Sequence, residues 1–121
     1  MAAFKSFKGF NVQSFASDPV QTSAWTTGGA MNTGRNNAAG MGTATAAWAG
    51  GGANSPTGYT NKGEEYNGTA WTEVTNLPTA TSYFACAGSQ TAGLFFGGTP
   101  GVLSQCFKYD GTTFTSSGSL A

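Results

Sequence analysis

The phrase EYNGTAWT at residues 65–72 decides the fold, because it returns as KYDGTTFT at residues 108–115. The end of the phrase, AWT, also stands 46 residues before its first full copy, at residues 24–26. Further Thr-Ala and Gly-Gly pairs match at that offset: Thr45-Ala46 with Thr91-Ala92, and Gly51-Gly52 with Gly97-Gly98. Matches at a fixed offset are the signature of a repeat architecture. The chain of 121 residues therefore contains two copies of one structural unit.

Each unit contains short apolar or aromatic runs closed by glycine, which is typical of β-strands. In the second unit these runs predict strands at residues 82–87, 94–96, 104–109 and 113–115. Helix signals are nearly absent, because glycine recurs too often to sustain a helix of three turns. We predict an all-β fold with two four-stranded antiparallel units, over residues 33–73 and 79–116.

Two dipeptides predict the turns before the last strand of each unit. Asn67-Gly68 and Asp110-Gly111 are typical of two-residue hairpins, in which both central residues take a positive φ. Cys86 and Cys106 fall on the predicted first and third strands of one unit. Such strands lie about 9.6 Å apart, which exceeds the roughly 7 Å that a disulfide spans. We expect both cysteines to be free thiols.

Composition argues against several classes of function. Only 8% of the residues are charged and the net charge is zero, so the chain has no field that attracts nucleic acid or an acidic membrane. No apolar run approaches the length of a membrane helix, and residues 1–10 do not form a secretory signal. We expect no nucleic-acid partner and no membrane insertion. Aromatic residues make up 13% of the chain and supply area to bury, which argues against disorder.

The sequence lacks the residue patterns of common catalytic sites. The chain has no histidine, which removes Ser-His-Asp and Cys-His catalysis and the commonest metal ligand. Glu64 and Glu65 are sequence neighbours that point to opposite sides of a strand, so they do not form a glycosidase pair. We interpret the carboxylates as solvated charges at loop edges. The glycine-rich runs lack the Gly-Lys-Ser/Thr ending of a phosphate loop. We expect no enzymatic activity, no cofactor and no metal.

The repeat resembles the kelch repeat of β-propellers, in which a double glycine is followed by a spaced tyrosine and then a spaced tryptophan. The first unit has Gly51-Gly52, Tyr66 and Trp71, and the second has Gly97-Gly98, Tyr109 and Phe114. The turn MNTGR at residues 31–35 looks like the kelch turn with its arginine, whereas LPTAT at residues 77–81 lacks the arginine. The resemblance covers residues 24–121 and implies two four-stranded blades (24–69 and 70–112) plus the start of a third.

Two blades do not close a propeller, which usually has four to eight. The resemblance therefore implies that other chains or missing sequence complete the ring. Three copies would close a six-bladed ring with three-fold symmetry, so we expect a homo-oligomer and favour a trimer.

Residues 64–72 and 90–98 also resemble virion proteins of marine tailed bacteriophages. This likeness implies a non-enzymatic structural or adhesive protein of the virion, made in the host cytoplasm, with other virion proteins as partners. A fibre or appendage component that recognises host-surface glycan is the leading interpretation. A purely architectural capsid or tail decoration protein and a small oligomeric propeller lectin remain as alternatives.

Three residues are candidates for ligand contact. Trp25 and Trp71 could stack on a sugar, or they could pack between blades at the kelch tryptophan position. Arg35 could reach a ligand, or it could bond to loop carbonyls at a blade junction. For Trp48 the core is favoured, because its repeat mate is Leu94.

Residues 1–23 have no counterpart in the repeats and are interpreted as an anchor segment. Phe4, Phe7 and Phe10 fall at a spacing of three, with Lys5 and Lys8 between them. The three rings could pack on the blades of the same or a sister chain, dock on a different virion protein, or belong to a loosely ordered tail.

Overall fold

The computed structural model describes residues 25–56 and 58–121, so Phe4, Phe7 and Phe10 of the predicted anchor lie outside the described residues. Within the described part the chain is all-β, and it contains no helix. The predicted fold class is confirmed at this level.

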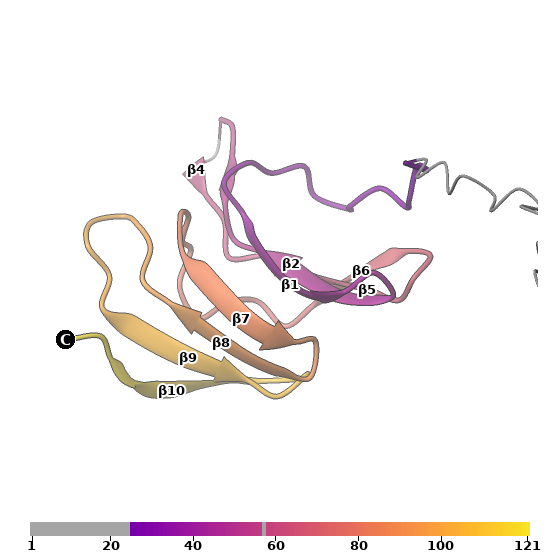
Figure 1. Ribbon diagram of the computed structural model, residues 1–121. Coiled ribbons are helices and arrows are strands. Elements are labelled where there is room, and N and C mark those ends of the chain that lie inside the picture. The colour runs from indigo at the N-terminus through magenta and orange to yellow at the C-terminus, as the bar shows by residue number, and fades with distance from the viewer. Residues whose placement is uncertain (1–24, 57) are drawn as a thin grey trace, which may run out of the picture.

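Two four-stranded sheets and one small hairpin make up the fold (Figure 1). The strands of the first sheet are, in spatial order, β1 (Ala39–Thr43), β2 (Ala46–Gly50), β5 (Gly63–Tyr66) and β6 (Trp71–Val74). Those of the second sheet are β7 (Ala85–Ser89), β8 (Ala92–Phe96), β9 (Gln105–Tyr109) and β10 (Phe114–Ser119). The hairpin of β3 (Ala53–Asn54) and β4 (Gly58–Tyr59) is inserted between β2 and β5. All pairings are antiparallel and follow chain order within each sheet, as the repeat predicts.

The turns at Asn67-Gly68 and Asp110-Gly111 differ from the prediction. Tyr66 pairs with Trp71, so the loop has four residues rather than two, and in each dipeptide only the glycine has a positive φ. Asn67 instead accepts hydrogen bonds at Oδ1 from the backbone N–H groups of Thr69 and Ala70, at 2.9 Å each. Asp110 does the same with Thr112 and Thr113. The Asn or Asp is needed here as a side-chain acceptor that closes the loop.

Paired residues on neighbouring strands share one side of a sheet, which defines two faces for each sheet. The front face of the first sheet carries a row of Met41, Trp48, Glu65 and Thr72. At the matching repeat positions, the front face of the second sheet carries Ala87, Leu94, Lys108 and Thr115. The back face of the second sheet carries Cys86, Phe95, Phe107 and Ser116 in one row, with Gly93, Tyr109 and Phe114 in the next.

The front face of the first sheet packs on the back face of the second. Trp48 is 0% exposed, and its ring centroid lies 4.7 Å from that of Phe95, 6.2 Å from Tyr109 and 6.1 Å from Phe114. Among the described residues the indole N–H is a buried donor without an acceptor, so Trp48 stabilises the contact through its ring area. Strands β1 and β7 lie side by side at one edge of the stack (Figure 1). The predicted core position of Trp48 is confirmed.

The double glycine of the first unit permits the close approach of the two sheets. The N–H of Gly52 donates to Thr81 O at 2.8 Å, which ties the first sheet to the segment that leads into β7. A Cβ at Gly51 would lie 2.4 Å from the ring of Phe84, and both glycines have a positive φ. A residue with a side chain would have to displace the neighbouring unit at this position.

Trp25 and Thr26 of the first AWT phrase do not lie in a strand of the described structure. Residues 25–35 have no strand hydrogen bonds. They form a lead-in that runs along the side of the first sheet away from the second sheet (Figure 1). The AWT phrase starts a strand at residue 71 because β5 lies beside it, whereas no described strand pairs with residues 25–28.

Candidate interaction faces

An ion pair is buried where the lead-in segment crosses the back face of the first sheet. Arg35 Nη2 lies 2.5 Å from Glu64 Oε1, and the two side chains are almost completely buried. Arg35 also donates to Thr33 O, Gly51 O and Lys62 O. Glu64 accepts the backbone N–H groups of Asn32 at 2.7 Å and Thr33 at 3.0 Å. The pair therefore fastens the lead-in to the first sheet.

Opposing effects act on the charge of Glu64. Burial disfavours the carboxylate, but hydrogen bonds from the backbone of Asn32 and Thr33 and from the side chains of Arg35 and Asn32 together outweigh it. The pKa of Glu64 is consequently lowered from its ordinary value, and the group is charged at neutral pH. The interpretation of Glu64 as a solvated charge at a loop edge is wrong, because Arg35 is 29 residues away in sequence and only the fold brings it close. The expectation that Glu64 and Glu65 point to opposite sides is confirmed, because Glu65 accepts the hydroxyl of Tyr109 at 2.9 Å across the sheet-to-sheet contact.

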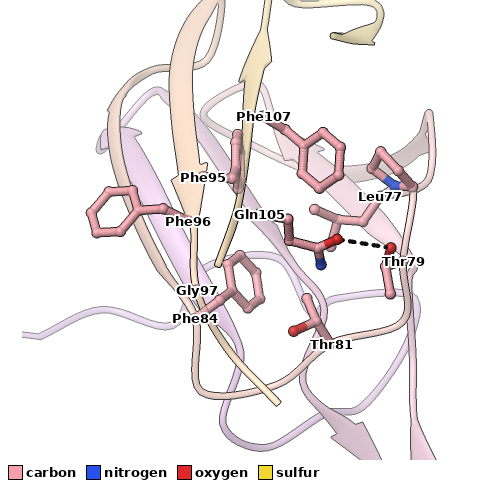
Figure 2. A pocket seen from close by; sticks show the side chains of 10 residues that line it. Leu77, Thr79, Thr81, Phe84, Phe95, Phe96, Gly97, Gln105 and Phe107 are labelled. Atoms are coloured by element: carbon pink, nitrogen blue, oxygen red, sulfur yellow. Dashed lines mark hydrogen bonds between the residues drawn. The ribbon is translucent and has the colours of Figure 1, made fainter. Parts of the chain in front are cut away.

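The second sheet has no ion pair at the matching place. Thr81 stands where the first unit has Arg35, and Phe107 stands where it has Glu64. Between them is a cavity of about 10 Å³ lined mainly by apolar side chains, which is no larger than one water molecule. Figure 2 shows the rings of Phe84, Phe95 and Phe107 around this space, with Thr79 bonded to Gln105 at 3.5 Å. In the second unit, aromatic packing around Thr81 thus takes the place of the buried ion pair of the first unit.

The front face of the second sheet is open, in contrast to that of the first. Leu94 is 36% exposed, whereas its repeat mate Trp48 is 0% exposed. Leu120 is 46% exposed, whereas its mate Leu77 is 3% exposed. Both leucines hold equivalent backbone positions, because Leu77 N–H donates to Asn61 O and Leu120 N–H donates to Ser104 O. The apolar side chains of this face lack the cover that the second sheet gives to the first.

The open face has a defined shape and charge. It forms an open hollow of about 640 Å³ around Leu94, with Ala87, Ala92 and Thr115 in its floor and walls. Lys108 stands on this face at the position where the front face of the first sheet has Glu65. Asp110 lies at the rim, where its hydrogen bonds to the backbone of Thr113 and Thr112 lower its pKa.

The three residues proposed for ligand contact lie in different environments. Trp25 is 102% exposed, so nothing in the described chain covers its ring. Trp71 is half-buried on the back face of the first sheet, with its ring centroid 5.0 Å from that of Tyr66. Arg35 donates to three backbone carbonyls and pairs with Glu64, which favours the prediction that it bonds to loop carbonyls. No observation supports a contact between Arg35 and a ligand. Within the described residues, the rings of Trp25 and Trp71 do not contact each other.

One end of the sheets presents exposed side chains that sequence reasoning did not single out. Tyr59 on the β3–β4 hairpin, Tyr83 before β7 and Val102 in the β8–β9 loop are all exposed. Tyr83 has φ +53°, like its repeat mate Asn37 at +52°. Asparagine tolerates this left-handed conformation and tyrosine does so poorly. The positive φ is therefore imposed by the repeat, and no residue pattern in the second unit signalled it.

The described residues hold little reactive chemistry. Cys86 and Cys106 are free, as predicted, and burial raises the pKa of Cys86 to about 11, so its thiol stays protonated. Burial and the neighbouring carboxylates, Glu65 foremost, raise the pKa of Tyr109, which keeps its hydroxyl as a donor. No group of three metal-ligating side chains gathers within residues 25–56 and 58–121. In the same residues, no helix long and apolar enough to span a membrane is found.

In comparisons with known proteins, no family model matches the chain, and no curated protein matches it significantly.

Proposed function

We propose that this chain is a non-enzymatic structural or adhesive protein of a bacteriophage particle, a fibre or appendage component whose two sheets are kelch-like propeller blades. The observation that carries the proposal is the open front face of the second sheet. The same face of the first sheet is buried under a neighbour, with Trp48 and Leu77 fully enclosed. Because exposed apolar surfaces mark interaction sites, a repeat with one uncovered contact face is typical of a protein that works in an assembly.

The blade interpretation rests on strand order and on the double glycine. Each sheet is a four-stranded antiparallel meander, and consecutive sheets pack face to face. Propellers are built in this way from four to eight blades. Because the chain supplies two, other chains or further sequence complete the ring. We favour three copies, since three pairs give six blades with the three-fold symmetry of phage fibres.

A non-catalytic role is supported by the way the carboxylates are used. Glu64 pairs with Arg35, Glu65 accepts from Tyr109, Glu73 pairs with Lys62 at 3.5 Å, and Asp110 closes a turn. Each carboxylate in the described residues therefore has a structural partner. With no histidine in the chain, we propose no catalytic residue, no cofactor and no metal.

The virion location is tested by asking whether the protein is part of purified particles. We expect peptides of this chain in phage particles purified through a density gradient, at a fixed ratio to the major capsid protein. A chain found in infected cells but missing from purified particles would contradict the virion role, and the small oligomeric lectin would then be favoured.

The adhesive form of the proposal is tested on a glycan array with the assembled chain. We expect retention on bacterial surface glycans and a loss of retention in Trp25→Ala, because the exposed indole is the ring best placed to stack on a sugar. The Trp71→Ala variant tests the other candidate. An assembled chain in purified particles that binds no glycan would leave the capsid or tail decoration protein as the function. Docking on other virion proteins through Phe4, Phe7 and Phe10 remains a prediction.

A further inference from the structure

We infer that the front face of the second sheet binds the back face of the first sheet of a second copy, head to tail, in the register that already joins the two sheets within one chain. The inference rests on the proposed role in an assembly and identifies the surface that forms it. The occupant is another copy because the chain itself contains both halves of the contact.

The internal contact supplies the template. Trp48 on the front face of the first sheet lies against the paired rings of Tyr109 and Phe114, whose centroids are 4.6 Å apart. The repeat mate of Trp48 is Leu94, which projects from the open front face of the second sheet. Shifting the internal contact by one unit therefore places Leu94 where Trp48 now lies, against the next back face.

The receiving surface has the matching feature. On the back face of the first sheet, Tyr66 and Trp71 form a ring pair with centroids 5.0 Å apart, at the repeat positions of Tyr109 and Phe114. Both residues are half-buried among the described residues. The lead-in segment passes Tyr66 at Gly28, where a Cβ would lie 3.4 Å from the tyrosine hydroxyl. The lead-in therefore lies beside the tyrosine hydroxyl, at one end of the ring pair.

The proposed contact also brings a lysine of the front face close to a carboxylate of the back face. The internal contact joins Glu65 to the hydroxyl of Tyr109. At the matching place between copies, Lys108 replaces Glu65 and lies over Tyr66. Glu73 stands diagonally opposite Tyr66 on β6, with its side chain half-exposed. Diagonal neighbours are about 7–8 Å apart, within the reach of a lysine. The front face thus presents a cation to a back face that presents two rings and the Glu73 carboxylate, which also pairs with Lys62.

The contact joins two different surfaces, so it is heterologous and each chain has one of each. Such contacts close into a ring when the rotation per subunit permits it, and they extend into a filament otherwise. A ring formed in this way continues the stacking of the internal sheets without a new kind of contact.

The first test compares two substitutions of exposed apolar residues in the full chain, followed by sedimentation velocity at micromolar concentration. Leu94→Glu puts a charge into the centre of the proposed contact, and we expect self-association to weaken at least about ten-fold. Val102→Glu is the matched control, because Val102 is exposed at the tip of the β8–β9 loop and away from both faces. Its association should equal that of the wild type. Circular dichroism checks that both variants keep the β fold.

The second test exchanges the proposed charge partners. Lys108→Glu and Glu73→Lys should each weaken association by about three-fold, and the double variant should recover most of the loss. Recovery distinguishes a contact between these residues from a general effect of charge.

Some outcomes would overturn the inference. A wild-type chain that is folded and monomeric, or a Leu94→Glu chain that assembles like the wild type, would show that this face does not join copies. A folded, monomeric wild-type chain would favour a further repeat of a longer chain as the element that covers the front face of the second sheet. The association measurements do not bear on whether the protein is present in phage particles, and absence from particles would not show that copies fail to associate through this face. The two proposals can therefore fail separately.

Discussion

The two sheets have the same strand order and the same turn positions, yet different interactions stabilise their back faces. The back face of the first sheet is fastened by the buried Arg35–Glu64 pair. The second sheet has Thr81 and Phe107 at those positions and closes around a small apolar cavity. The comparison shows that the repeat preserves backbone geometry, whereas each side chain is fitted to what lies against it.

The front faces differ in a second way. In the first sheet, the front face is a buried contact centred on Trp48, and in the second sheet the equivalent surface centred on Leu94 is open. A large aromatic side chain at the covered position and a smaller aliphatic one at the open position match these environments. Because Trp48 and Leu94 are repeat mates, each is a matched control for the other.

The largest expected effect is at the covered front face. Trp48→Ala removes the ring that fills the contact between the sheets, and we expect the free energy of unfolding to fall by about 4 kcal/mol. Chemical denaturation followed by far-UV circular dichroism measures the loss.

Leu94→Ala is the matched change at the open face. Because Leu94 is exposed, its removal should alter the stability of the dissociated chain by no more than about 0.5 kcal/mol. Equal losses from Trp48→Ala and Leu94→Ala would break the distinction between a covered and an open face.

The next largest effect is expected at the buried ion pair. Glu64→Gln keeps the shape of the side chain but leaves Arg35 buried without a counter-charge, so the free energy of unfolding should fall by about 3 kcal/mol. Glu73→Gln is the control, because Glu73 pairs with Lys62 on the surface and should contribute less than about 1 kcal/mol. Similar small losses for both variants would show that the pair does not fasten the lead-in segment.

Acid should weaken the first sheet through Glu64. Its pKa in the folded chain is lower than the ordinary value of 4.5 that the unfolded chain has, so the charged form stabilises the fold above that value. This contribution is lost as pH falls through the lower, folded pKa. Denaturant melts between pH 7 and pH 3 should show the loss in the wild type, and a smaller dependence in Glu64→Gln. An unchanged pH dependence in the variant would assign the acid sensitivity to other carboxylates.

The smallest effect is expected at a turn that the two sheets share. Asn67→Ala removes the acceptor for two backbone N–H groups and should cost about 1 kcal/mol. Asn67→Asp copies the residue of the second unit and should leave stability nearly unchanged. Thermal unfolding of the two variants measures the difference, and a costly Asn67→Asp would mean that the two turns are not equivalent.

Much of the fold was predictable because the repeat marks it directly. Glycine pairs, turn residues and aromatic runs at a fixed offset predicted the two four-stranded units, and the strand order placed Cys86 and Cys106 apart. The exposure of Leu94 was not predictable, because a repeat position indicates the same backbone environment but not the presence of a covering neighbour. The partner of Glu64 was missed for a related reason, since Arg35 reaches it only when the lead-in folds back across the sheet.

The central claim is that the open front face of the second sheet is completed by another copy, and the mass of the intact assembly tests it most directly. Native mass spectrometry of the full 121-residue chain at micromolar concentration should show a discrete closed species with three chains of 12.2 kDa as the favoured number. A compact, cooperatively unfolding species of 12.2 kDa at that concentration would contradict the claim.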